Sequence, residues 1–154
     1  PGERAAVDAQ DLGRLGLDAR VMSLEQFLKI IKDHRGMIKP LLLRQDKFAG
    51  IGNIIADEAL WRVKIHPEAL INDLAARRLA ALHRGIIATI KNILKSGGTS
   101  LRDWGHPDGK KGGYQELRLI YGKAGSPCPR CRTRLCRLVV GGRGTTVCPR
   151  CQRQ

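Results

Sequence analysis

The chain has 154 residues, enough for one modest domain or two small ones, and 42% of them are hydrophobic. No apolar run approaches the ~20 residues that cross a bilayer, and no signal peptide is recognisable, so we expect neither a membrane protein nor a secreted one. The formal net charge is +14, and the excess lies after residue 36, because residues 1 to 36 carry six acids and six bases. Such a chain favours a polyanion as partner, with a merely soluble basic surface as the alternative.

The first part of the sequence predicts two helices after a linker-like start. Residues 1 to 20 have scattered charges and little periodicity, which is typical of a linker or of the remnant of an interdomain segment. Ser23 and Gln26 form a capping box for a helix predicted over 24–34. A second helix is predicted over 37–48.

A glycine-rich turn separates this second helix from a third, and it favours a phosphate ligand. Gly50 and Gly52 permit a sharp reversal, and Asn53 is expected to cap a helix over 54–63. Free N–H groups at a helix start attract anions. A helical hairpin with a capped turn and no ligand is the alternative interpretation.

A long helix comes next, followed by a polar stretch. Asn72 or Asp73 is expected to cap the helix, and Gly97-Gly98 to stop it. Its apolar stripe is predicted to face the core: Leu79, Leu82, Ile86, Ile90 and Ile93. His83 beside this stripe is expected to be structural. Residues 99–113 are polar over a length that indicates either function or disorder.

Four cysteines near the C-terminus form two Cys-x-x-Cys pairs: Cys128, Cys131, Cys148 and Cys151. This spacing predicts a tetrahedral structural zinc site, with two disulfides as the alternative. The residues between the pairs read as strand, glycine turn and strand, with Arg143 at the tip of the hairpin. Cys136 is expected to be a small buried apolar residue.

Several motifs occur in an order that resembles one family, the formamidopyrimidine-DNA glycosylase/endonuclease VIII family. The resemblance is to its C-terminal helix–two-turn–helix module and zinc finger, from about residue 24 to Cys151. The motifs are Phe48-Ala49-Gly50-Ile51-Gly52-Asn53-Ile54, Asp57-Glu58-Ala59-Leu60-Trp61, Ile65-His66-Pro67, Gly97 to Asp103, Asp108-Gly109-Lys110, Tyr121-Gly122 and Gly142-Arg143-Gly144-Thr145. The fold class it implies is mainly α with a small β zinc ribbon.

The resemblance also implies a function and a set of site residues. The family excises oxidised purines, formamidopyrimidine and 8-oxoguanine, from duplex DNA and cleaves the abasic strand. By matching positions, Arg35, Asn53 and Arg143 are DNA contacts, and Arg143 takes part in the final elimination step. Lys110, Lys111 and Tyr114 match the loop that closes over the everted base, and the four paired cysteines hold one zinc ion.

The family's catalytic proline and glutamate stand at its own N-terminus on a β-sandwich domain, and the match to Pro1 fails because Gly2 follows it. We therefore expect the chain to be the DNA-binding half of a glycosylase/AP lyase that lacks its N-terminal catalytic domain and is inactive alone. The alternative is a stand-alone, non-catalytic zinc-ribbon module for nucleic acid. A monomer in a bacterial cytoplasm, associated with the nucleoid, is expected.

The expected domains are a linker at 1–20, a helix–two-turn–helix domain at 21–121 with a lesion loop at 99–115, and a four-cysteine zinc finger at 122–154. From this division we expect zinc removal to unfold the zinc finger and to leave the helical part largely intact.

Overall fold

The structure is a computed structural model that describes residues 16–96 and 118–154. The expectations for Pro1, for the 99–115 loop and for Lys110, Lys111 and Tyr114 lie outside these residues. In the described part, no helix is both long enough and apolar enough to cross a membrane. The fold is mostly helical with a small antiparallel hairpin next to the paired cysteines, as the sequence predicts.

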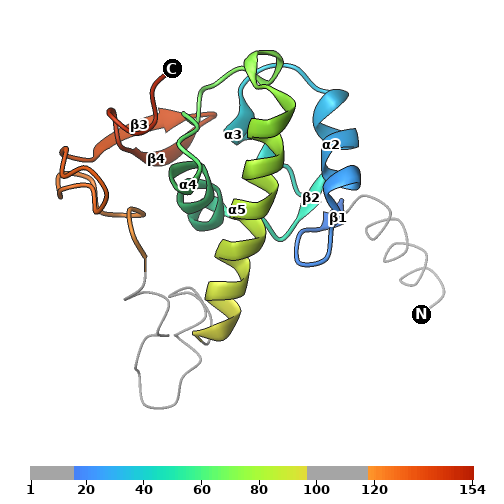
Figure 1. Ribbon diagram of the computed structural model, residues 1–154, viewed down its shortest axis with the longest axis horizontal. Coiled ribbons are helices and arrows are strands. Elements are labelled where there is room, and N and C mark those ends of the chain that lie inside the picture. The colour runs from blue at the N-terminus through green and yellow to red at the C-terminus, as the bar shows by residue number, and fades with distance from the viewer. Residues whose placement is uncertain (1–15, 97–117) are drawn as a thin grey trace.

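Most of the regular secondary structure in the described residues is helical (Figure 1). The helices are α2 (Leu24–Lys32), α3 (Ile38–Leu42), α4 (Asn53–Arg62) and α5 (Ala76–Lys95), with a short 3-10 turn, η1 (Ile71–Asp73), before α5. Two-residue strands β1 (Leu17–Asp18) and β2 (Phe48–Ala49) pair in parallel beside α2. The hairpin consists of β3 (Cys136–Val140) and β4 (Arg143–Val147).

The start of α2 follows the sequence prediction. The Ser23 hydroxyl accepts from the Gln26 N–H, and the Gln26 side chain accepts from the Ser23 N–H, which completes the capping box. The inner face of α2 buries Phe27, whose ring lies 5.4 Å from that of Phe48. Phe48 is fully buried, but it lies in β2 and not in a helix.

The helix predicted over 37–48 is shorter than expected and ends at Leu42. Residues 48–49 pair with 17–18 instead of continuing the helix. The Gln45 side chain holds the intervening turn, because it accepts from the Gly50 N–H and donates to the Ile51 carbonyl. Long-range strand pairing therefore overrides the local helical pattern here.

Both predicted asparagine caps are wrong. Gly52 is the N-cap of α4, and Asn53 is its first helical residue. Asn72 and Asp73 lie in η1, and α5 begins at Ala76. The segment before α5 is bonded to the loop between α2 and α3, because the Ile71 N–H donates to the Gly36 carbonyl at 2.8 Å.

The apolar stripe of α5 faces the core, as the spacing predicts. All five members are buried: Leu79, Leu82, Ile86, Ile90 and Ile93. The ring of His83 bonds the Met22 carbonyl through Nε2 at 3.0 Å and lies beside Phe27, so its role is structural.

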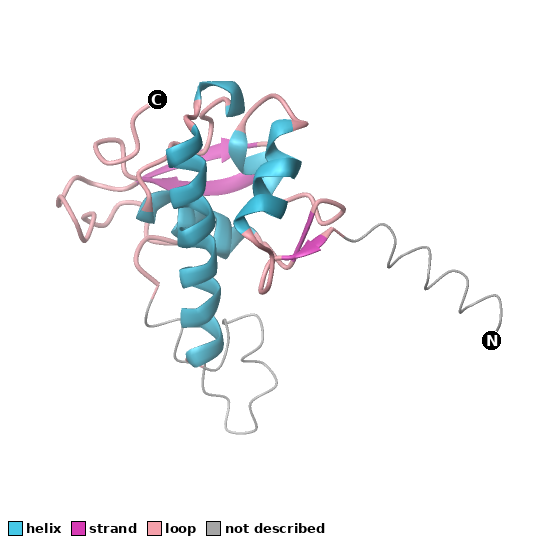
Figure 2. Cartoon of the chain, turned by 45° about the vertical axis from the view of Figure 1, so that its right-hand side comes forward, coloured by secondary structure: helices cyan, strands magenta, loops and turns pink. Residues whose placement is uncertain are grey.

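Helix α4 is the centre of the fold, packed between α5 and β4 (Figures 1 and 2). Seven of its ten residues are buried, including Asp57 and Glu58. Strand β4 packs against α4, whereas β3 is the outer strand and is mostly exposed. Cys136 lies on β3 and is exposed, so the prediction of a buried apolar cysteine is wrong.

Candidate nucleic-acid interface and metal centre

The four paired cysteines converge at the base of the hairpin. Their sulfur atoms all lie within 4.8 Å of one another, with 3.4 Å between Cys131 and Cys148 and 4.0 Å between Cys128 and Cys151. A tetrahedral zinc ion with Zn–S bonds of about 2.3 Å needs sulfur–sulfur separations of about 3.8 Å. A disulfide would need about 2.05 Å. The thiols are free, and the four of them fit one structural zinc ion.

The four thiols differ in acidity. Hydrogen bonds from the side chain and backbone of Thr133 lower the pKa of Cys131 to about 6. Burial raises the pKa of Cys148 to about 12. Zinc binds thiolates, so its binding has to release the proton of Cys148, and zinc affinity falls as the pH is lowered.

Each of the two zinc-binding loops is attached to the helical part by a side chain of its own, Arg130 on the first loop and Gln152 on the second. The Gln152 side chain accepts from the Cys148 N–H at 2.8 Å and donates to the Ile65 carbonyl at 3.0 Å. On the other loop, Arg130 donates to the carbonyl of Trp61 at 3.1 Å, at the end of α4. Both loops are thus hydrogen-bonded to residues 61–65, where α4 ends and the chain leaves it.

A buried ion pair joins α3, α4 and the hairpin. The Lys39 ammonium, with no exposed surface, lies 2.7 Å from Asp57 Oδ1 and donates to Thr145 Oγ1 at 2.6 Å. Asp57 Oδ2 accepts from the Thr146 N–H at 3.1 Å. Burial lowers the pKa of Lys39 and raises that of Asp57, while each opposite charge acts against that shift.

Glu58, the next residue of α4, is also fully buried. Its carboxylate accepts from three successive backbone N–H groups, those of Leu119, Ile120 and Tyr121, at 2.8 to 3.0 Å. These bonds fix the chain that leads into the zinc-binding part. They also keep a buried carboxylate hydrogen-bonded, as a buried charge requires.

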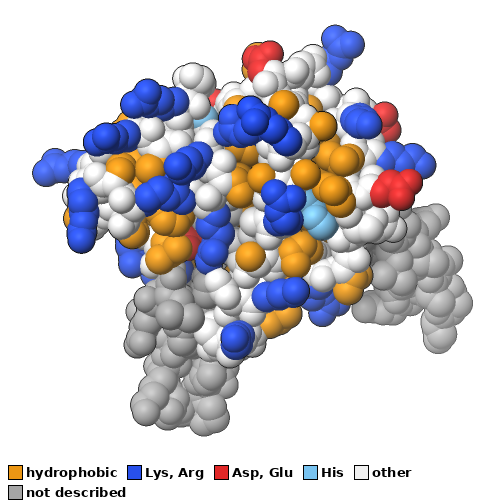
Figure 3. Space-filling view, viewed as in Figure 1, with side chains coloured by type: hydrophobic (Ala, Val, Ile, Leu, Met, Phe, Trp, Pro, Cys, Tyr) orange, Lys and Arg blue, Asp and Glu red, His pale blue; other side chains and the backbone are white. Residues whose placement is uncertain are grey.

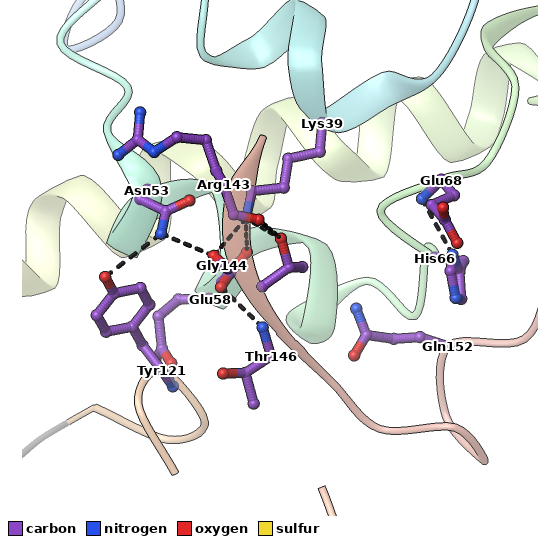
Figure 4. Close-up of polar contacts among 12 residues, drawn as sticks. Lys39, Asn53, Glu58, His66, Glu68, Tyr121, Arg143, Gly144, Thr146 and Gln152 are labelled. Atoms are coloured by element: carbon purple, nitrogen blue, oxygen red, sulfur yellow. Dashed lines mark hydrogen bonds and ion pairs between the residues drawn. The ribbon is translucent and has the colours of Figure 1, made fainter. Parts of the chain in front are cut away.

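The start of α4 meets the tip of the hairpin (Figure 4). Asn53 Nδ2 donates to the Gly144 carbonyl at 2.9 Å and to the Tyr121 hydroxyl at 3.3 Å. Lys39 donates to the same Gly144 carbonyl at 3.3 Å, and the Thr145 hydroxyl donates to the Arg143 carbonyl at 2.9 Å. Asn53 and Arg143, predicted from the sequence as DNA contacts, are therefore brought together.

The two-glycine turn also anchors the hairpin tip, because it packs on α3. Gly141 and Gly142 both have positive φ, which is the conformation of a tight two-residue hairpin turn. A Cβ at Gly141 would lie only 2.9 Å from Pro40 Cγ, so the turn packs directly on α3. The exposed guanidinium of Arg143 is thus presented from an anchored backbone.

Basic side chains cover much of the face seen in Figure 3, with many over the hairpin and the zinc-binding loops. The last 27 residues contain seven Arg and no acid. Arg35 is exposed between α2 and α3, and in the described residues no hydrogen bond joins it to Asn53 or Arg143. Asn53 is thus bonded to the residue next to Arg143, and Arg35 stays a prediction.

From the sequence, no role in the site was assigned to the residues that hold it together: Lys39, Asp57, Glu58, Trp61, Tyr121 and Thr145. A signal for three of them exists in the sequence. Asp57 and Glu58 interrupt an otherwise apolar helix, and Lys39 stands among apolar residues. Charges at such positions are paired when the helix is buried.

Comparison with known proteins gives the same assignment for both parts. Residues 15–104 match the formamidopyrimidine-DNA glycosylase H2TH domain, and residues 125–154 match the zinc finger found in FPG and IleRS. A formamidopyrimidine-DNA glycosylase of Roseiflexus sp. is 42% identical over 99% of this chain and 58% of its own length. One of Pelotomaculum thermopropionicum is 43% identical, over 83% of this chain and 47% of its own.

Solved structures are similar as well. The MutM (Fpg) protein of Thermus thermophilus has a TM-score of 0.82 and 37% identity, over 90% of this chain and 54% of that one. The Lactococcus lactis Fpg in complex with DNA containing FAPY-dG has a TM-score of 0.83 and 34% identity, over 97% of this chain and 55% of that one.

These matches correct one expectation and establish the family. The chain spans about half the length of these relatives, but they are glycosylases aligned over up to 99% of it, and these matches do not show it to be only a DNA-binding half without a catalytic domain. That prediction is wrong, and so is the alternative of a stand-alone zinc ribbon, because the H2TH match covers most of the rest of the chain. The chain belongs to the formamidopyrimidine-DNA glycosylase family, with a structural zinc in its FPG-type zinc finger.

Proposed function

We propose that this protein binds duplex DNA that contains a damaged base, and holds its sugar-phosphate backbone at the junction of α4 and the hairpin tip. The observation that carries the proposal is the hydrogen bond of Asn53 to the Gly144 carbonyl, next to the exposed guanidinium of Arg143. The fork of an arginine matches phosphate geometry. A net charge of +14 supports a polyanionic partner.

The arrangement around the turn supports a helix–two-turn–helix. Helix α3, the turn at residues 43–52 and helix α4 follow one another, and Gly50 has a positive φ of 100° within the turn. The first N–H groups of α4 have no partners inside the helix, and they add a positive end beside Arg143. Arg35 is proposed as a further phosphate contact.

For the whole protein we propose excision of formamidopyrimidine-type lesions, the activity in the names of its relatives. Arg143 would then assist the final elimination step, and Lys110, Lys111 and Tyr114 would belong to the loop over the lesion. A monomer in the bacterial cytoplasm, with domains at 21–121 and 122–154, completes the proposal. Base release from a duplex with a single such lesion, and its absence with undamaged duplex, tests the activity.

Replacement of Asn53 tests the DNA-binding site at α4. Asn53→Ala removes the hydrogen bond to the Gly144 carbonyl. We therefore expect the affinity of the protein for duplex DNA to fall roughly tenfold, for damaged and undamaged DNA alike. The fall is sequence-independent because backbone contacts carry no base information. Fluorescence anisotropy with labelled duplexes measures it.

The matched control for this experiment is Asn72→Ala, at an exposed amide in η1. It should bind as the wild type does. Equal affinities of the two variants would exclude Asn53 from the DNA-binding site.

A further inference from the structure

The indole of Trp61 contacts the zinc centre from the helical part. Its Nε1 lies 3.4 Å from the sulfur of Cys128, with the N–H as donor and the sulfur as acceptor. Both side chains are removed from water, because Trp61 is 5% exposed and Cys128 is fully buried. The remaining members of this small core are Ile120, Leu135 and Cys148, so the sulfur is the polar partner in the cluster for the indole N–H.

A second contact fixes the orientation of the indole. Arg130, which lies between the two ligand cysteines of the same loop, places its guanidinium 4.1 Å from the centre of the Trp61 ring. It also donates to the Trp61 and Arg62 carbonyls, at 3.1 and 3.3 Å. The ring is therefore held by the loop that supplies Cys128 and Cys131, and the N–H remains directed at the sulfur.

A ligand sulfur bound to zinc carries negative charge, and an N–H donor stabilises that charge. Hydrogen bonds to charged acceptors are stronger than neutral ones, and burial strengthens them further. Residues that hydrogen-bond metal ligands orient them, and their loss weakens metal binding. Any buried indole N–H needs an acceptor, and the acceptor of the Trp61 N–H is a zinc ligand, so the two side chains satisfy each other.

We infer that Trp61 is a positioning residue of the zinc centre, whose indole N–H holds the sulfur of Cys128 in place and raises the affinity for zinc. The inference is independent of DNA binding and of the proposed function. Because Trp61 lies on α4, the helix whose first residue is Asn53, it connects the metal centre to the helical part by a side-chain hydrogen bond.

The test compares Trp61→Phe with Trp104→Phe, since the chain contains only these two tryptophans. Trp61→Phe keeps an aromatic ring but removes the N–H. We expect its zinc affinity to fall roughly tenfold to a hundredfold, measured by competition with a chromogenic chelator. Trp104→Phe should keep the wild-type affinity. Equal zinc affinities of the two variants, with equal helix content by circular dichroism, would overturn the inference.

A second measurement leaves Trp61 in place, so it does not depend on how well Trp61→Phe folds. The Trp104→Phe chain, loaded with a spin-half cadmium isotope instead of zinc, contains a single indole N–H. A hydrogen bond to a ligand sulfur transmits scalar coupling between that proton and the metal, and we expect to observe it by NMR. A single, well-resolved indole signal without such coupling would show that Trp61 is only apolar filling.

Discussion

Removal of zinc is expected to unfold residues 122–154 and also to destabilise the helices by about 1–3 kcal/mol. The core around the metal centre has five buried members, too few to hold the hairpin alone, so the binding energy of zinc is folding energy for this part. When the hairpin leaves, Lys39 loses the Thr145 hydroxyl and the Gly144 carbonyl, and Asp57 loses the Thr146 N–H. The Lys39–Asp57 pair stays in the helical part, but it loses these hydrogen bonds and the packing of β4 on α4, which destabilises α3 and α4.

The expected loss of helix stability differs from the expectation drawn from the sequence, in which the helices stay largely intact after zinc removal. The measurement is urea unfolding followed by the helical circular dichroism signal, with and without a strong chelator. The midpoint should move to lower urea when zinc is removed. An unchanged midpoint of the helical signal would mean that the two parts are independent in energy, and it would argue against the buried contacts between them.

Asp57→Ala is expected to destabilise the protein by about 3–5 kcal/mol at neutral pH, although Asp57 lies in no predicted active site. The substitution leaves the fully buried Lys39 ammonium without its carboxylate, 2.7 Å away in the wild type. It also leaves the buried Thr146 N–H without an acceptor. Chemical denaturation at neutral pH measures the free energy of unfolding.

A double-mutant cycle separates the ion pair from loss of packing. Lys39→Met with Asp57→Ala should cost less than the sum of the two single variants, because the double variant leaves no unpaired charge. Asp73→Ala, at an exposed carboxylate in η1, is the control and should have little effect. Strict additivity in the cycle would show that Lys39 and Asp57 do not interact.

Local patterns were sufficient to predict much of this fold. The capping box at Ser23, the stripe of α5, the two-glycine hairpin turn and the four paired cysteines each depend on residues close together in the sequence. In such cases the sequence itself contains both partners of the interaction. The prediction that Arg143 lies at the hairpin tip, and Asn53 near a helix start, follows from the same kind of pattern.

The contacts that assemble the site could not be predicted in this way. Asn53 was expected to cap its own helix, but its amide instead bonds Gly144, ninety-one residues away. The buried Lys39 pairs with Thr145 over a similar separation. The end of α3 at Leu42 likewise depends on pairing between residues far apart. No periodicity contains such information, because it arises from the packing of α4 between two other elements.

Arg143, held at the anchored hairpin tip, is proposed to contact a DNA phosphate. The most direct test is the salt dependence of duplex binding by the wild type and Arg143→Ala, with Arg20→Ala as control, since the Arg20 guanidinium is already paired with Asp18. We predict weaker binding for Arg143→Ala, with a slope of log affinity against log salt that is shallower by about 1. A slope and an affinity for Arg143→Ala that equal those of the wild type and of Arg20→Ala would contradict this proposal.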